Sequence, residues 1–173
     1  MMESLRVVVG VNGSLSSLAA LYRAVEEAAR REAVLVPVIG WSSTENERLQ
    51  PLSELEHMAR RRLDTVFEQA FGGYPNDIVI RPLVVRSEAG PALVAAADRA
   101  SDLLVLGSGR HGRLHHTLHG SVARHCRAHA ACKVVVVSPS KLLESMELTA
   151  RSGAPIPFLA RSSRTSRRPA AAR

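Results

Sequence analysis

Several common features are missing from this chain, and each absence narrows what it can do. No apolar run approaches the roughly 20 residues that a membrane-spanning helix needs. The only two cysteines, Cys126 and Cys132, lack the CxxC spacing of a metal site, so we expect reduced thiols in ordinary structural positions. No GKS or GKT is present, which argues against an ordinary P-loop ATPase. The first residues lead into a predicted strand without a secretory leader pattern, so we expect a cytoplasmic protein.

The net charge of +7 is concentrated towards one end of the chain. Residues 141–173 contain seven Lys and Arg and two Glu, a net charge of +5, whereas residues 1–140 carry only +2. We therefore predict one domain over residues 1–140 and a basic tail over residues 141–173. The tail is rich in Pro, Ser and Arg without periodicity, which predicts disorder. Its arginines are not interleaved with aromatic residues, so we do not expect a nucleic-acid partner.

The stretch LLVLGSGRHGRLHHTLHGSV, residues 103–122, organises the rest of the chain. Its apolar start predicts a buried parallel strand, and Gly107, Gly109 and Gly112 follow within six residues. Glycines let a backbone approach a ligand closely, and Ser121 can cap the helix that follows. Backbone N–H groups beside a helix N-terminus favour phosphate, so this loop is a candidate phosphate site.

Strands and helices alternate along the predicted domain, which indicates an α/β fold with a parallel sheet and helices on both faces. Pro82 marks the third strand as an edge strand or a bulged one. Ligands of such sheets bind beyond the carboxyl ends of the strands, where the strand order reverses. If the first and fourth strands are neighbours, the turns at residues 10–14 and 107–112 line one crevice. We predict strands at residues 5–11, 34–39, 78–85, 103–106 and 133–137, and helices at residues 17–31, 52–71, 88–100 and from 117 or 121 to 130.

Two helices carry charged faces. In the first helix, Glu26, Glu27 and Arg30 lie opposite the apolar positions, and either Ser14 or Ser16 can cap its start. In the second helix, we interpret the run of arginines at residues 60–62 as solvent-exposed. Residues 40–51, between the second predicted strand and the second predicted helix, are predicted to be a polar connection.

Four segments of the chain resemble the universal stress protein family. They are VVVGVNGSLSSLAALYRAVEEA, LLVLGSG, the later HGSV and the closing ACKVVVVSP, and together they extend over about residues 5–139. The resemblance implies an adenine-nucleotide alpha-hydrolase-like fold whose five parallel strands have the order 3-2-1-4-5. It also implies a homodimer formed through the last strand, here the four valines from Val134 to Val137. An unpaired apolar edge strand would otherwise invite aggregation.

Nucleotide-binding members of the family carry the pattern G-x2-G-x9-G-[ST] for the phosphates of ATP and an Asp in the first turn for the adenosine. In this chain the second glycine of the pattern is Arg110 and the Asp is Asn12. Arg110 could obstruct a phosphate or pair with it, and Gly109 could restore the freedom of the loop. The cofactor implied is ATP or another adenine nucleotide, with Mg²⁺ as a candidate companion. The predicted binding residues are Gly10, Val11, Asn12, Gly40, Leu106, Gly107, Gly109, Arg110, Gly112, Gly120, Ser121 and Val122.

Three hypotheses of function follow. The first is a binding module whose nucleotide occupancy or dimer state is read by an unidentified protein partner. The second is a dimeric interaction protein of the same fold that has lost nucleotide binding through the changes at Asn12 and Arg110. The third is a weak ATP hydrolase, for which the sequence shows no catalytic base, so we do not expect a dedicated enzyme.

Histidines are concentrated in one part of the chain, where six of the seven lie between His111 and His129. The pairs His115–His119 and His125–His129 have i,i+4 spacing, which places two imidazoles on one helix face. Two such ligands can bind zinc weakly, but no third ligand lies nearby in the sequence. We therefore expect no native metal site.

Overall fold

The computed structural model describes residues 4–42, 51–109 and 122–140. The chain divides into a unit Met1–Pro139 and a unit Ser140–Arg173, and nearly all the described residues belong to the first. The predicted disorder of the basic tail concerns residues outside the described ranges. Among the described residues, no helix is long and apolar enough to cross a membrane.

The described residues form a five-stranded, all-parallel sheet with helices on both faces, which confirms the predicted fold. The strand order is 3-2-1-4-5, as the family resemblance implied. The elements are β1 (Arg6–Gly10), α1 (Leu15–Arg31), β2 (Val34–Trp41), α2 (Leu52–Phe71), β3 (Leu83–Arg86), α3 (Ala89–Ala96), β4 (Leu103–Gly107), α4 (Val122–His129) and β5 (Lys133–Val137).

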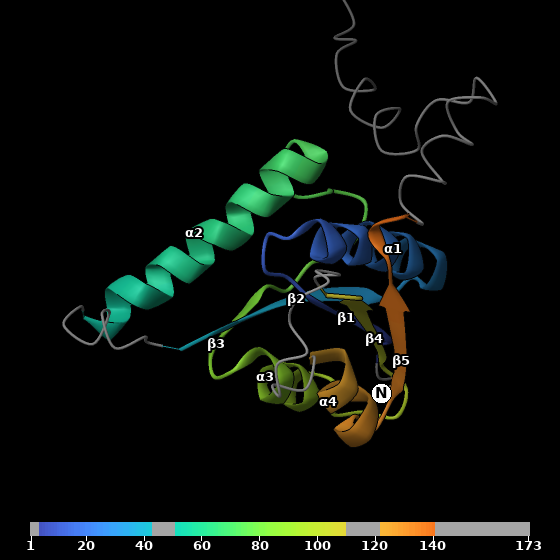
Figure 1. Ribbon diagram of the computed structural model, residues 1–173. Coiled ribbons are helices and arrows are strands. Elements are labelled where there is room, and N and C mark those ends of the chain that lie inside the picture. The colour runs from blue at the N-terminus through green and yellow to red at the C-terminus, as the bar shows by residue number, and fades with distance from the viewer. Residues whose placement is uncertain (1–3, 43–50, 110–121, 141–173) are drawn as a thin grey trace, which may run out of the picture. The chain divides into compact units, whose positions relative to one another are not determined.

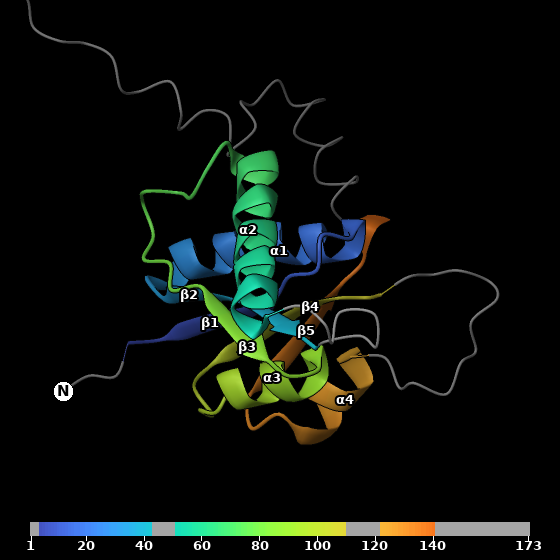
Figure 2. The same ribbon diagram turned by 90° about the vertical axis from the view of Figure 1, so that its left-hand side faces the viewer.

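Two helices cover each face of the sheet. Both views of the ribbon place α1 and α2 on one side and α3 and α4 on the other (Figure 1 and Figure 2). The central strands β1 and β4 are buried on both faces, so nearly every residue in them is apolar. Because β1 and β4 are hydrogen-bonded neighbours, the turn after β1 and the loop after β4 begin at the same edge of the sheet. That adjacency is the condition for a shared crevice.

The third strand is shorter than predicted. β3 begins at Leu83, and before it Ile80 makes only an isolated bridge to Leu35. Pro82 has no N–H to donate to a ladder, so it separates the bridge from the strand. Of the two predicted alternatives, an edge strand or a bulged one, the edge position is confirmed.

Two further boundaries differ from the prediction. β2 continues to Trp41, so Gly40 lies inside the strand and not in a polar connection. α3 ends at Ala96, four residues early, since Arg99 N–H donates to the Asp102 carboxylate at 3.1 Å and Asp102 N–H donates to the Arg99 carbonyl at 3.0 Å. These two bonds turn the chain towards β4 before another helical turn can form.

Helix α1 begins at Leu15, two residues earlier than predicted, with Ser14 as its N-cap. The Ser14 hydroxyl accepts a hydrogen bond from Ser17 N–H at 3.2 Å, so the first of the two predicted caps is confirmed. The sequence places Glu27 opposite the apolar positions of this helix, yet the structure buries it, and only 3% of the residue is exposed. The three arginines of α2 at residues 60–62 are exposed, as predicted.

Candidate functional site

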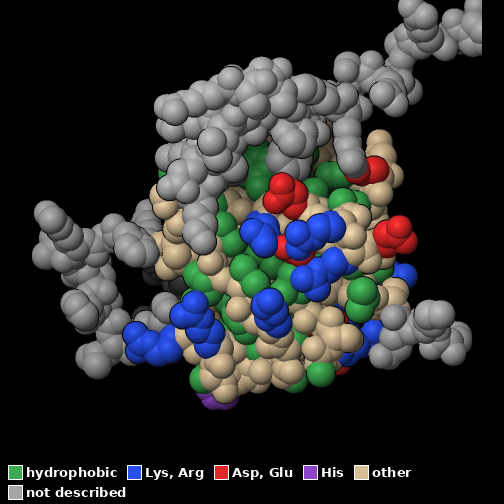
Figure 3. All heavy atoms as spheres, turned by 90° about the vertical axis from the view of Figure 1, so that its right-hand side faces the viewer, with side chains coloured by type: hydrophobic (Ala, Val, Ile, Leu, Met, Phe, Trp, Pro, Cys, Tyr) green, Lys and Arg blue, Asp and Glu red, His purple; other side chains and the backbone are tan. Residues whose placement is uncertain are grey.

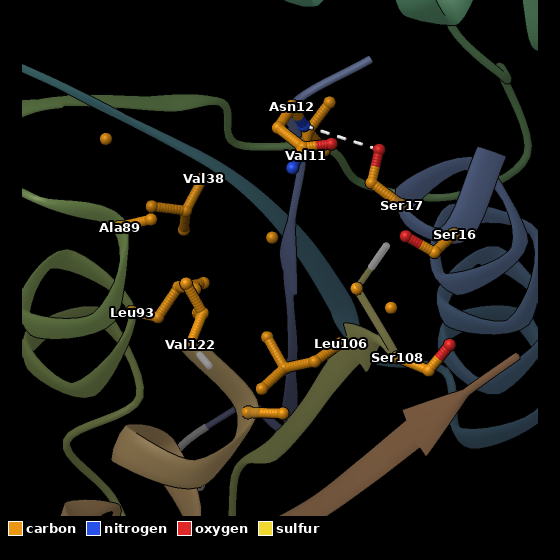
Figure 4. Close-up of a pocket in the computed structure, with 15 residues that line it drawn as sticks. Val11, Asn12, Ser16, Ser17, Val38, Ala89, Leu93, Leu106, Ser108 and Val122 are labelled. Carbon is orange, nitrogen blue, oxygen red and sulfur yellow. Dashed lines mark hydrogen bonds between the residues drawn. The ribbon is translucent and has the colours of Figure 1, made fainter. Parts of the chain in front are cut away.

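A cavity of about 300 Å³ lies at the carboxyl ends of β1, β2 and β4 (Figure 4). The turn after β1 and the loop after β4 both line it, so the structure brings the two predicted turns together. The end of β2 and the first residues of α1, α3 and α4 complete the wall. The lining residues are Gly10, Val11, Asn12, Ser16, Ser17, Val38, Gly40, Ala89, Leu93, Leu106, Gly107, Ser108, Gly109, Val122 and Ala123.

One side of the cavity is apolar. Figure 4 shows Val38, Ala89, Leu93 and Val122 together, from β2, α3 and α4. Gly40 makes this side possible, because a Cβ there would lie 2.8 Å from the Ser87 carbonyl oxygen and 3.0 Å from the Ala89 Cα. Without a side chain at Gly40, the start of α3 can approach β2 and close the apolar side.

The opposite side is formed by hydroxyl groups at the start of α1. Ser17 Oγ lies 3.4 Å from the backbone nitrogen of Asn12, which donates to it (Figure 4). Ser16 Oγ lies 3.1 Å from Ser14 Oγ. The Asn12 side-chain oxygen accepts a hydrogen bond from Ser14 N–H at 2.9 Å, so this oxygen is already used within the turn. The amide NH₂ of Asn12 is the side-chain group that can donate to a ligand.

The glycine that ends β4 and the glycine two residues later are required for two different reasons. A Cβ on Gly107 would overlap the Ser16 carbonyl and lie 2.8 Å from Ser17 N, so only glycine lets the first turn of α1 pack against β4. Gly109 has φ +80°, in the left-handed region, with open space around it. Between them, the buried Ser108 hydroxyl has no hydrogen-bond partner within the described part of the chain. The Ser108 N–H donates to the Val137 carbonyl oxygen at 2.9 Å, so a ligand in the cavity would meet the backbone of Gly107 and Gly109 and not the Ser108 side chain.

The charge of the cavity wall is unusual for an anion site. None of the described lining residues carries an ionisable side chain. Any anion held by these residues would be held by backbone N–H groups and by hydroxyls, which is the chemistry of glycine-rich phosphate loops. These described residues also offer no His, Asp, Glu, Cys or Lys to act as a general base.

The family model for "Universal stress protein family" matches residues 4–138 of the chain. This chain belongs to the universal stress protein family. The family resemblance seen in the sequence is therefore confirmed, and the match extends over the whole described sheet. A search of curated proteins finds no match.

Solved structures of other family members share the fold. Universal stress protein UspA from Lactobacillus plantarum is 19% identical with a TM-score of 0.58, covering 79% of this chain and 99% of its own. A universal stress protein family member from Burkholderia pseudomallei is 25% identical with a TM-score of 0.55, covering 76% and 94%. A universal stress protein solved in complex with cAMP is 27% identical with a TM-score of 0.53, covering 79% and 98%.

The structure brings together eight of the predicted binding residues and does not describe the other four. Arg110, Gly112, Gly120 and Ser121 lie outside the described residues, so the second half of the glycine pattern is not placed. Sequence analysis missed the hydroxyl side of the cavity, because it considered the serines at the start of α1 only as helix caps. The eight predicted residues that line the cavity are Gly10, Val11, Asn12, Gly40, Leu106, Gly107, Gly109 and Val122.

The histidine and cysteine side chains of α4 have structural contacts. The rings of His125 and His129 stack with centroids 4.4 Å apart, and His129 Nδ1 lies 2.8 Å from the His125 carbonyl oxygen. The described residues contain no cluster of three or more His, Cys, Asp or Glu that could hold a metal ion. Cys126 and Cys132 are free thiols, and burial raises the pKa of Cys126 to about 11, which keeps that thiol protonated and unreactive. The other predicted pair, His115 and His119, lies outside the described residues.

Proposed function

We propose that this chain is a universal stress protein-type binding module that holds an adenine nucleotide in the cavity between the turns after β1 and β4. The observation that carries the proposal is that both turns line one cavity with an apolar side and a hydroxyl-bearing side. The family member solved in complex with cAMP supports an adenine nucleotide as the ligand class.

The two sides of the cavity suit the two parts of a nucleotide. The apolar side, with Val38, Leu93 and Val122, offers the contacts that a base requires. Backbone N–H groups near Gly107 and Gly109 offer the donors that phosphates require. A volume of about 300 Å³ is at the low end for small-molecule sites, which suits a nucleoside with its phosphates directed towards the glycine-rich loop.

We propose ATP as the ligand and no dedicated enzyme activity. None of the described lining residues carries a carboxylate, so an accompanying Mg²⁺ would be bound through the phosphates and not through these side chains. The same residues include no general base, so ATP hydrolysis, if it occurs, would be weak. The nucleotide state would be read by a protein partner in the cytoplasm.

The alternative is an interaction protein of the same fold that has lost nucleotide binding. Asn12 favours it, because the side-chain oxygen at this position is uncharged and already accepts one hydrogen bond from Ser14 N–H, so it would be a weaker acceptor for a ribose hydroxyl than a carboxylate. Arg110, at the second glycine of the family pattern, is the other departure.

Titration calorimetry of nucleotide-free, folded protein distinguishes the two functions. We expect heat of binding with ATP, AMP and cAMP below millimolar concentration, and less with GTP. Arg110→Gly is expected to weaken ATP binding about tenfold if the guanidinium pairs with a phosphate, because charge-assisted hydrogen bonds are strong. Tighter binding by this variant would mean that Arg110 obstructs the site. An absence of heat at millimolar nucleotide would support the alternative.

We also propose that the protein is a homodimer paired through β5. This strand lies at the edge of the sheet, and its central valines are only half-buried within one chain. Pairing with a second copy would bury them and satisfy the free edge of the strand. Light scattering should give twice the 18.7 kDa mass of one chain, and a stable monomer at high concentration would contradict the proposal.

A further inference from the structure

Three arginines of α1 converge on one buried carboxylate. Arg23 donates through Nε and Nη2 to Glu27 Oε1 at 2.9 and 2.8 Å. Arg30 Nη2 and Arg31 Nε donate to Glu27 Oε2 at 2.6 and 2.9 Å. Spacings of three and four residues place all four side chains on one helix face. We refer to Arg23, Glu27, Arg30 and Arg31 as the Glu27 cluster.

The cluster presents more positive charge than its carboxylate neutralises. Burial would raise the pKa of Glu27, but the hydrogen bonds from the three arginines outweigh it and lower that pKa to about 2. Glu27 is therefore ionised at neutral pH, and three guanidinium groups around it leave a net charge of +2. The Glu27 side chain is only 4% exposed, whereas those of Arg23, Arg30 and Arg31 are 47%, 68% and 37% exposed.

The guanidinium nitrogens that do not contact Glu27 are available to a partner. A guanidinium has five N–H donors in a planar fork, and none of the three uses more than two of its nitrogens on Glu27. Within the described residues, none of the three makes another hydrogen bond or ion pair. Because Glu27 already restrains them, less side-chain entropy is lost when a partner binds.

Stability alone does not explain this arrangement well. Burying a carboxylate costs several kcal/mol, and a buried ion pair often stabilises a protein no more than apolar residues of the same size would. What the buried carboxylate does provide is a fixed geometry for three cations near the C-terminal end of a helix, where cations are favoured. On the side of the molecule that α1 reaches, Lys and Arg side chains gather around a few carboxylates (Figure 3).

We propose that the Glu27 cluster is a docking surface for an acidic segment of a protein partner. Guanidinium forks pair with carboxylates through two parallel hydrogen bonds, and clusters of arginine recognise acidic motifs. The cluster extends over residues 23–31, about 12 Å along the helix at 1.5 Å per residue, which matches a few carboxylates on a short peptide.

A nucleic-acid strand fits this surface less well than an acidic protein segment does. Exposed Glu26 lies within the span of the cluster and exposed Glu32 follows it, so the positive field here is short and interrupted, whereas a phosphate backbone follows a continuous one. The surface is also separate from the cavity, since Ser16 and Ser17 line the cavity at the first turn of α1 and Arg31 is its last residue. A partner docked here could bind whether or not the cavity holds a ligand.

Fluorescence anisotropy with a labelled 12-residue peptide of alternating Glu and Ser tests the proposal on the full chain. We expect salt-dependent binding that Arg30→Gln weakens about fivefold, as expected for loss of one charge-assisted contact. The matched control is Arg60→Gln, which removes an exposed arginine from α2 and should change the affinity less than twofold. The basic tail is present in every variant, so any binding to it is common to Arg30→Gln and Arg60→Gln, and the difference between these two variants reports on the Glu27 cluster. A peptide with Gln in place of Glu should not bind.

Glu27→Gln separates a positioned surface from mere positive charge. This variant gains one positive charge, so simple electrostatics predicts tighter binding, whereas loss of positioning predicts about threefold weaker binding. Tighter binding, or equal effects of Arg30→Gln and Arg60→Gln, would overturn the proposal. Stronger binding to a 20-base-pair DNA duplex with the same Arg30 dependence would overturn the choice of partner. If Glu27→Gln does not fold, the comparison of the two arginine variants decides.

Discussion

Gly107→Ala is expected to lower the free energy of unfolding by about 2–3 kcal/mol and to weaken nucleotide binding by about tenfold or more. The new Cβ would overlap the Ser16 carbonyl and lie 2.8 Å from Ser17 N. Both are backbone atoms at the start of α1, so no side chain can rotate away to relieve the overlap. The first turn of α1 must then move, and it carries the hydroxyl side of the cavity. Urea denaturation and titration calorimetry measure the two effects.

Ser108→Ala is the matched control for the predicted loss of stability. It changes the next residue, and it removes a buried hydroxyl that has no partner among the described residues. Removing an unsatisfied polar atom should leave the free energy of unfolding unchanged or slightly higher. If Gly107→Ala were as stable as Ser108→Ala, the close packing of α1 against β4 would be wrong, and with it the shape of the cavity.

Asp102→Ala is expected to lower the free energy of unfolding by about 3 kcal/mol, because it breaks a largely buried ion pair. Only 1% of the Asp102 side chain is exposed. It accepts hydrogen bonds from Arg6 Nε at 2.9 Å, from Arg6 Nη2, and from the backbone of Arg99. Arg6 begins β1 and Asp102 immediately precedes β4, so the pair joins the two strands whose opposite ends form the cavity.

Asp98→Ala tests whether burial is the reason. Asp98 pairs with the same guanidinium, but 64% of its side chain is exposed. Solvent screens an exposed pair, so this substitution should have a much smaller effect than Asp102→Ala. Equal destabilisation by the two variants in urea denaturation would show that the charge of Arg6, and not the burial of its partner, determines the contribution.

Much of the sheet could be predicted from the sequence. Continuous apolar runs identified β4 and β5, and helical periodicity with a terminal glycine gave α2 its observed bounds. The crossover rules for parallel strands and the family resemblance then implied the order of the sheet. Because that order makes β1 and β4 neighbours, the meeting of their two turns at one cavity followed from sequence as well.

Contacts between distant residues could not be predicted in this way. The steric need for Gly107 arises from the backbone of Ser16, more than 90 positions earlier, and that of Gly40 from the chain after β3. The burial of Glu27 was also missed. The i,i+4 spacing of Glu27 from Arg23 and Arg31 is visible in the sequence. A charged residue on the polar side of a helix is ordinarily exposed, however, and the burial of Glu27 is seen only in the packed structure.

The central claim is that the turns after β1 and β4 form one nucleotide site, and backbone amide NMR tests it most directly. Titrating ¹⁵N-labelled protein with ATP should shift the amide signals of residues 10–12 and 107–109 together, along one saturable curve. Amides in the middle of α2 serve as the internal reference and should not move. Signals of both turns that stay unchanged at millimolar ATP, or that follow different curves, would contradict the account.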